Sequence, residues 1–265
     1  MNKAPLGVFD SGIGGLTVAR ALFERLPHES VIYFGDTARV PYGPKSPDTV
    51  RRYSGEILAY LLQRGVKAVV VACNTSTAHA LSYLQERSSV PVVGVIEPGA
   101  RAAVAATRTG TIGVIGTAGT IASGAYERAI KALRADARVH SQPCPLFVPL
   151  VEEGWFEHPA AEPIAREYLE PLTRAKVDVL VLGCTHYPLL KPLLARVMGP
   201  DVKLVDSAEE TATAVARELE RLDLLSNGGS HEHRFVVSDD EPHFRKVGAR
   251  FLGEKLKQVE VVPLG

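Results

Sequence analysis

The chain has 265 residues, of which 46% are hydrophobic and 23% charged, a composition typical of a globular protein with one large or two moderate domains. Lys plus Arg and Asp plus Glu each total 30, so the formal net charge is zero, and no surface for nucleic acid or an anionic membrane is predicted. We find no signal peptide and no apolar run long enough to cross a bilayer. Three cysteines without a CxxC pair favour a reducing cytoplasm over a disulfide framework.

Short β-branched runs alternate with longer segments of helical periodicity along the chain. The predicted strands are residues 6–9, 31–34, 68–72, 92–95, 111–115, 177–182 and 202–205. The predicted helices are residues 16–26, 48–63, 78–85, 160–174 and 208–222. This alternation indicates an α/β fold with mainly parallel sheets, and strands that are apolar throughout indicate helices on both faces.

Two motifs occur twice, in the same order and at similar spacing. The sequence VKAVVVACNT at residues 66–75 matches VDVLVLGCTH at 177–186, and GVFDSG at 7–12 matches GVIGTA at 113–118. The repeat predicts two pseudo-symmetric α/β domains with an active site in the cleft between them.

The boundaries of these domains are predicted from the turns and from the last elements of the chain. A final strand–helix–strand unit follows a surface turn at residues 226–230, and its parts are 234–238, 243–252 and 258–262. We expect this unit to pack back on the first domain, which then comprises residues 1–97 and 207–265. The second domain is 98–206, with Pro98–Gly99 as a hinge.

Cys73 and Cys184 each follow an apolar strand and precede polar residues and then a helix. After Cys184, Pro188 is well suited to the first turn of that helix. Both thiols are therefore expected at the carboxyl edge of a sheet, where α/β proteins bind ligands, and near a helix N-terminus, which favours the thiolate. A single free cysteine is more often buried and inert, but two at matching positions indicate a chemical pair. One thiolate can remove a proton from a carbon acid while the other thiol returns one on the opposite face, as a racemase requires. No lysine lies within or just before either motif, so no pyridoxal site is predicted.

Two further motifs have both a functional and a plain structural interpretation. Asp10 opens a glycine-rich turn, DSGIGG, whose following helix can bind a carboxylate, although Asp10 is equally suited to cap that helix. Pro41-Tyr42-Gly43 is typical of a turn with an exposed tyrosine.

The remaining candidates lie in the second half of the chain and in its tail. Glu152-Glu153 has the form of a solvated helix start. His186, two residues after Cys184, is either a satisfied polar residue or a group that tunes the neighbouring thiol. Cys144 is interpreted as structural, and His231-Glu-His233 as solvated rather than as a metal site.

The motifs FDSGIGGL (9–16), PYG (41–43), ACNT (72–75) and GCTHYP (183–188) together resemble the signature of bacterial glutamate racemases, within the aspartate/glutamate racemase superfamily. The resemblance covers nearly the whole chain, including Gly116–Thr117 and residues 147–154. It implies interconversion of L- and D-glutamate in the cytoplasm without cofactor or metal, supplying D-glutamate for peptidoglycan. Such enzymes are often homodimers.

The resemblance also implies roles for individual residues. Cys73 and Cys184 are the implied acid/bases, with Asp10 as partner of the first and Glu152 and His186 assisting the second. The implied substrate-binding residues are Asp10, Ser11, Pro41, Tyr42, Gly43, Asn74, Thr75, Thr117, Thr185 and His186.

Three other functions compete with this one. The nearest is a racemase or decarboxylase of the same superfamily that acts on aspartate, a hydantoin or a malonate; a decarboxylase is expected to keep one cysteine only. A two-lobed binding protein needs export, for which no signal is seen. A Rossmann dehydrogenase is disfavoured because the glycine loop lacks the GxGxxG spacing.

Overall fold

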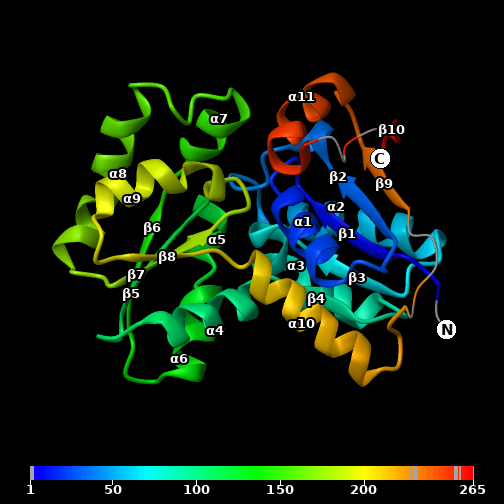
Figure 1. Cartoon of the computed structure of the whole chain (residues 1–265), viewed down its shortest axis with the longest axis horizontal. Coiled ribbons are helices and arrows are strands. Elements are labelled where there is room, and N and C mark those ends of the chain that lie inside the picture. Colours follow the sequence, from blue (N-terminus) through cyan, green and yellow to red (C-terminus); the bar gives the residue numbers. More distant parts are fainter. Residues whose placement is uncertain (1–2, 227, 229–231, 254–255, 257, 265) are drawn as a thin grey trace.

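The computed structural model describes residues 3–226, 228, 232–253, 256 and 258–264, whose strands form two parallel sheets (Figure 1). The first sheet has the order β10-β9-β2-β1-β3-β4 and the second the order β6-β5-β7-β8. The strands of the first are β1 (Leu6–Asp10), β2 (Val31–Gly35), β3 (Ala68–Val71), β4 (Val92–Gly94), β9 (His233–Val237) and β10 (Val259–Val261). Those of the second are β5 (Thr111–Gly116), β6 (Arg138–Pro143), β7 (Val179–Gly183) and β8 (Lys203–Val205).

Helices cover both faces of both sheets, as the apolar strands predict. Around the first sheet lie α1 (Leu16–Arg25), α2 (Pro47–Gln63), α3 (Asn74–Arg87), α10 (Ala208–Arg221) and α11 (Glu241–Leu252). Around the second lie α4 (Ile96–Ala106), α5 (Ala118–Ala122), α6 (Ala125–Leu133), α7 (Phe147–Glu152), α8 (Ala161–Arg174) and α9 (Lys191–Met198). Two short 3-10 helices, η1 (Thr37–Arg39) and η2 (Tyr187–Leu190), complete the described elements. None of the described helices is long and apolar enough to cross a membrane.

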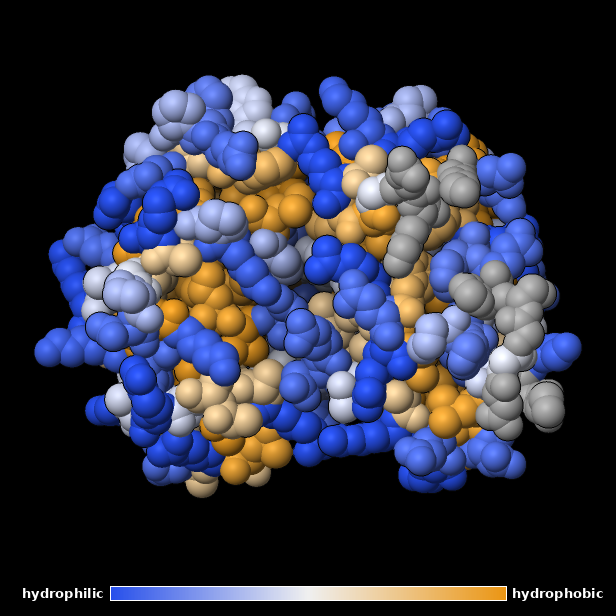
Figure 2. Space-filling view, in the orientation of Figure 1, coloured by the Kyte–Doolittle hydropathy of each residue, from blue (hydrophilic) through white to orange (hydrophobic). Residues whose placement is uncertain are grey.

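Alternate residues of each central strand belong to different cores. In β3, Ala68 and Val70 pack with α1, α10 and α11, whereas Val69 and Val71 pack with α2 and α3. Because successive side chains of a strand point to opposite faces, such a strand must be apolar at every position. Polar side chains cover most of the face seen in Figure 2, with apolar ones showing between them in both halves.

The two sheets repeat one topology. The order β2-β1-β3-β4 in the first corresponds to β6-β5-β7-β8 in the second. The repeated sequence motifs therefore occupy equivalent strands, β1 with β5 and β3 with β7. In each sheet the next strand along the chain lies on one side of the first strand, β1 or β5, and the strand after that lies on its other side. Ligands of open α/β sheets bind in the crevice at the point where the strand order reverses in this way. In the first sheet Asp10 is the last residue of β1 and Cys73 comes just after β3, while in the second Thr117 follows β5 and Cys184 follows β7.

The final strand–helix–strand unit corresponds to β9, α11 and β10; β9 pairs with β2, and β10 pairs with β9 and forms the edge of the first sheet. The turn predicted before it, at residues 226–230, falls partly outside the described residues. Pro98 and Gly99, which we expect at a hinge, both lie in α4 and not in a turn. Proline is accepted there because the N–H groups of a first helical turn have no intrahelical partner. The division at residues 97 and 206 remains our proposal for the domains, and its first boundary falls within this helix.

Candidate active site

A small closed cavity lies where the carboxyl ends of the two sheets face each other. Its volume is about 20 Å³, room for about one water molecule. The predicted site residues that line it are Ser11, Pro41, Tyr42, Gly43, Cys73, Asn74, Thr75, Thr117, Cys184, Thr185 and His186. Larger hollows of about 630 and 830 Å³ lie against α2 and α3 and between α3, α4 and α6, where neither cysteine is part of the lining. The cavity lined by the two cysteines is therefore smaller than both of these hollows.

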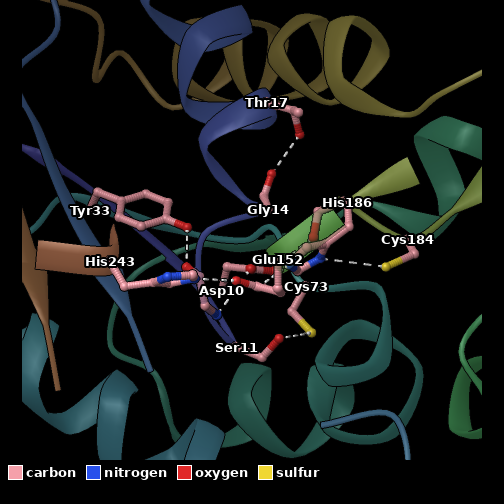
Figure 3. Close-up of polar contacts among 12 residues, drawn as sticks. Asp10, Ser11, Gly14, Thr17, Tyr33, Cys73, Glu152, Cys184, His186 and His243 are labelled. Atoms are coloured by element: carbon pink, nitrogen blue, oxygen red, sulfur yellow. Dashed lines mark hydrogen bonds and ion pairs between the residues drawn. The ribbon is translucent and has the colours of Figure 1, made fainter. Parts of the chain in front are cut away.

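Cys73 sits at the junction of β3 and α3. It occupies the N-cap position of α3, and its Sγ accepts a hydrogen bond from the Ser76 N–H at 3.4 Å. Its thiol also points to the Ser11 hydroxyl, with 3.7 Å between Sγ and Oγ (Figure 3). The helix starts directly after the cysteine, at Asn74, rather than at residue 78 as its apolar periodicity predicted.

The environment of Cys73 favours its thiol and not its thiolate, which corrects our expectation from the helix N-terminus. Burial raises the pKa of Cys73 to about 11, and the nearby Asp10 carboxylate raises it as well. The hydrogen bonds from Ser76 and with Ser11 act in the opposite direction but do not compensate. In the closed cleft Cys73 is therefore protonated at neutral pH.

This raised pKa predicts a loss of stability at alkaline pH. The thiol ionises near 9.0 in the unfolded chain and about 11 in the folded one, so the folded state binds more protons between these values. Its contribution is complete below pH 9 and is lost as the pH rises to 11, amounting to about 3 kcal/mol. We expect urea denaturation to show that the wild type loses about this much relative to Cys73→Ser over that range. Equal pH dependence in the two proteins would contradict the assignment.

Cys184 has a different local environment, although its strand position matches that of Cys73. The 3-10 helix η2 begins at Tyr187, and the α-helix α9 begins only at Lys191. The nearest polar partner of Cys184 is the imidazole of His186, with 3.8 Å between Sγ and Nδ1. A histidine thus takes the place that a helix N-terminus has beside Cys73.

His186 is buried and connects Cys184 to Glu152 (Figure 3). Its Nε2 donates a hydrogen bond to Glu152 Oε1 at 2.5 Å, because a carboxylate can only accept. Burial lowers the pKa of His186, but the hydrogen bonds to Cys184 and Glu152 and their charges hold it well above the usual value. The resulting imidazolium places a positive charge beside Cys184 Sγ.

Glu152 is the last residue of α7 and not a solvated helix start as predicted. Its side chain is 17% exposed, and its second oxygen accepts a hydrogen bond from His243 Nε2 at 3.1 Å. Burial raises the pKa of Glu152, but the bonds and charges of His186 and His243 lower it more, so the group is an anion at neutral pH.

Asp10 lies fully buried at the end of β1, beside the cavity and close to both cysteine motifs. Its carboxylate accepts hydrogen bonds from the Gly12 N–H at 3.1 Å and from the Thr185 hydroxyl at 3.3 Å. Burial raises the pKa of Asp10, while the charge of His186 and the N–H groups of Gly15 and Gly12 oppose this rise. The N-cap position of α1 belongs to Gly15, so Asp10 organises the turn rather than capping the helix.

Polar residues from the two halves bond to each other across the closed cleft. The Thr75 and Thr117 hydroxyls are 2.9 Å apart, and Tyr126 donates to Asn74 Oδ1 at 2.7 Å. The Gly119 N–H donates to the Gly43 carbonyl at 3.0 Å. Several predicted substrate-binding groups therefore satisfy one another when no ligand separates them.

Tyr42 is buried, with 1% of its surface exposed, where the turn motif predicted an exposed tyrosine. Its hydroxyl donates to the carboxylate of Asp36, which also accepts from Arg39 at 2.7 Å and Ser238 at 2.8 Å. The neighbouring Val40–Pro41 peptide is cis, and both residues line the cavity. This network holds the 37–43 loop over Cys73.

A sequence model described as Asp/Glu/Hydantoin racemase matches residues 15–215. The chain belongs to this racemase family. The racemase is 56% identical over 260 residues to a glutamate racemase of Geobacter metallireducens, which covers 98% of this chain and 96% of that protein. Among solved structures, it resembles a glutamate racemase isoform of Bacillus anthracis, with a TM-score of 0.94, 42% identity and coverage of 100% and 98%. A Francisella tularensis glutamate racemase in complex with D-glutamate matches with a TM-score of 0.93, 39% identity and coverage of 99% and 98%.

Four residues in or beside this candidate site had no signal in the sequence. Val40 and Val148 line the cavity, Tyr126 bonds to Asn74, and His243 bonds to Glu152. Val40 is next to the Pro41 motif, and Val148 lies within the matching residues 147–154. Neither was predicted, because a single apolar residue in a sequence does not indicate a binding role. His243 and Tyr126 lie in helices whose periodicity reports only the buried face.

The remaining candidate residues are not part of the cavity lining. Cys144 is buried with its thiol directed at the Gln142 carbonyl, and all three cysteines are free. In the predicted solvated stretch His231 lies outside the described residues, while His233 belongs to β9 and stacks on Phe23 at 3.8 Å between ring centroids. The described residues contain no group of three or more His, Cys, Asp or Glu side chains able to hold a metal ion.

Proposed function

We propose that the protein interconverts L- and D-glutamate, with Cys73 and Cys184 as its two acid/base groups. The observation that carries the proposal is that the two cysteines come from equivalent strands of two facing sheets and line one cavity. The glutamate racemases among its relatives, one of them in complex with D-glutamate, support glutamate as the substrate. Each enantiomer presents its α-hydrogen to one cysteine and accepts a proton from the other.

The two cysteines are prepared differently for this reaction. Cys73 is a thiol in the closed cleft, able to give a proton. Cys184 instead has the imidazolium of His186 beside it, with 3.8 Å between Sγ and Nδ1. One thiolate and one thiol are the combination that a single turnover needs, and the reaction leaves them exchanged.

The charged groups of glutamate match the polar residues around the cavity. We propose that the Asp10 carboxylate attracts the substrate ammonium and that hydroxyl and amide groups of Ser11, Asn74, Thr75, Thr117 and Thr185 donate hydrogen bonds to the substrate carboxylates. Fixed dipoles in a closed, water-poor site stabilise the negative charge that develops as the α-proton leaves. Because the cavity of about 20 Å³ is far too small for an amino acid, substrate entry requires the two halves to separate.

The cellular setting is part of the same proposal. We propose a cytoplasmic homodimer that needs neither cofactor nor metal and whose D-glutamate is consumed in peptidoglycan synthesis. The three free cysteines suit a reducing compartment.

The test is incubation of the purified protein with L-glutamate in D2O without any added cofactor. We expect the circular dichroism signal to decay to zero and deuterium to enter the α-position, with no change after dialysis against EDTA. L-aspartate and a hydantoin, the substrates of the competing racemases, are the comparison arms. Absence of both racemisation and exchange with glutamate would overturn the proposal, and faster turnover of a comparison substrate would reassign it.

A further inference from the structure

Glu152 is shared between two histidines that come from different halves of the molecule (Figure 3). Its Oε1 binds His186 Nε2 at 2.5 Å, and its Oε2 binds His243 Nε2 at 3.1 Å. Glu152 and His186 belong to α7 and to the turn after β7, around the second sheet. His243 lies in the first turn of α11, which packs on the first sheet. The carboxylate therefore joins the two halves next to the cysteine site.

The backbones on both sides of this carboxylate are firmly placed. On one side, Asp240 caps α11 by accepting from the His243 N–H at 3.2 Å, and the adjacent Phe244 is fully buried. On the other, the Phe147 ring of α7 packs edge-on against Tyr187, with 5.3 Å between centroids. With both backbones held in this way, the orientation of the Glu152 side chain depends on its own hydrogen bonds. The two histidines donate one hydrogen bond to each of its carboxylate oxygens.

We propose that His243 is a positioning residue for proton transfer at Cys184. Through its hydrogen bond, His243 holds Glu152 in the orientation that faces His186, and His186 in turn lies against Cys184 Sγ at 3.8 Å. Without His243, the partly exposed Glu152 carboxylate gains water as a competing partner, and its hold on the His186 imidazolium weakens. Because His243 comes from the other half, the chain of contacts is complete only when the cleft is closed.

This role, which rests on the proposed two-cysteine racemisation, makes an asymmetric prediction. L- and D-glutamate have equal free energies, so any variant must lower kcat/KM equally in both directions. The step that limits the rate is nevertheless free to change. If only transfer at Cys184 is slowed, that step becomes more limiting than transfer at Cys73.

Primary isotope effects with α-deuterated L- and D-glutamate measure this change. For the enantiomer whose α-hydrogen Cys184 removes, we expect the isotope effect on kcat/KM to rise in His243→Ala. For the other enantiomer, which Cys184 reprotonates, we expect it to fall. We expect kcat/KM itself to fall about 10- to 100-fold, the size of effect on activity that loss of a residue orienting a metal-bound histidine has in metalloenzymes. His243→Gln, whose amide nitrogen can reach the same oxygen, is expected to restore most of the rate and the wild-type isotope effects.

Arg250→Ala is the matched control for cleft closure. The Arg250 guanidinium lies 5.0 Å from the Phe156 ring centroid, so it joins the same two regions, and among the described residues it forms no ion pair with Glu152, whose ion-pair partners are His186 and His243. Its loss is expected to change both isotope effects in the same direction or neither. The same pattern in His243→Ala, or isotope effects identical to wild type, would overturn the proposal.

A readout without turnover separates this inference from the proposed function. In protein labelled with 15N-histidine, we expect His243→Ala to shift the His186 ring resonances and His243→Gln to return them towards the wild-type positions. Unchanged His186 resonances would refute the positioning role even if the enzyme racemises glutamate. A wild-type protein that fails to exchange the α-hydrogen would instead refute the proposed function, whatever the resonances show.

Discussion

Replacing either Cys73 or Cys184 with alanine is expected to lower the rate of racemisation about 10²- to 10⁴-fold in both directions, the usual contribution of a positioned acid/base group. Each direction uses both thiols, one to take a proton and the other to give one. The measurement is loss of circular dichroism from L- and D-glutamate, each as starting substrate.

The α-hydrogen exchange of the same variants in D2O is more specific. Each variant retains a group on one face of the substrate only, so any surviving exchange is expected to keep the configuration and to be confined to one enantiomer. The favoured enantiomer should be opposite in the two variants. Cys144→Ser is the control, because that buried thiol has a backbone carbonyl as its hydrogen-bond partner and is not part of the cavity lining. Near-normal racemisation by either alanine variant would show that the two-cysteine mechanism is wrong.

Gly14→Ala is expected to lower kcat/KM by about 10²-fold or more while leaving the fold in place, because misplacing reacting groups by about 1 Å has effects of that size. Gly14 lies in the turn after β1, and a Cβ there would stand 2.4 Å from Thr185 Oγ1 and 2.6 Å from His186 Nδ1. Both of these atoms belong to the other half of the molecule. The added methyl group therefore obstructs closure and displaces His186, whereas an open cleft relieves the contact.

Comparing activity with stability tests this explanation. We expect the free energy of unfolding of Gly14→Ala, measured in urea, to fall much less than the activity implies. Gly65→Ala is the matched control, since nothing lies within 4 Å of its Cβ position and its φ of +68° makes the change costly for stability alone. A Gly14→Ala enzyme with wild-type kcat/KM would contradict the close approach of the two halves.

The parallel sheets and the equivalence of the two cysteine strands could be predicted from sequence because they depend on local pattern. A strand such as 68–71, buried on both faces, has to be apolar throughout, and that signal needs no knowledge of its neighbours. The repeated motifs are local patterns too, and they predicted that Cys73 and Cys184 follow equivalent strands. The topology then brings the ends of those strands to one cavity.

Properties that depend on distant neighbours could not be predicted. The turn motif at Tyr42 does not reveal that the buried Asp36 carboxylate accepts its hydroxyl. A cysteine at a helix N-terminus favours the thiolate, yet burial beside Asp10 reverses that preference at Cys73. The bond between His243 and Glu152 joins residues 91 positions apart in the chain, and no local spacing encodes it.

The position of β9 has a consequence for how the chain acquires its structure during synthesis. All four strands of the second sheet lie within residues 111–205, so that sheet can pair completely as soon as they have been made. The first sheet cannot, because β2 pairs on one side with β9, where Tyr33 stands opposite Phe235. Until those late residues arrive, β2 presents an open edge, the kind of surface through which nascent chains associate wrongly. The interval between the two events is therefore the stage at which this protein most needs protection from aggregation.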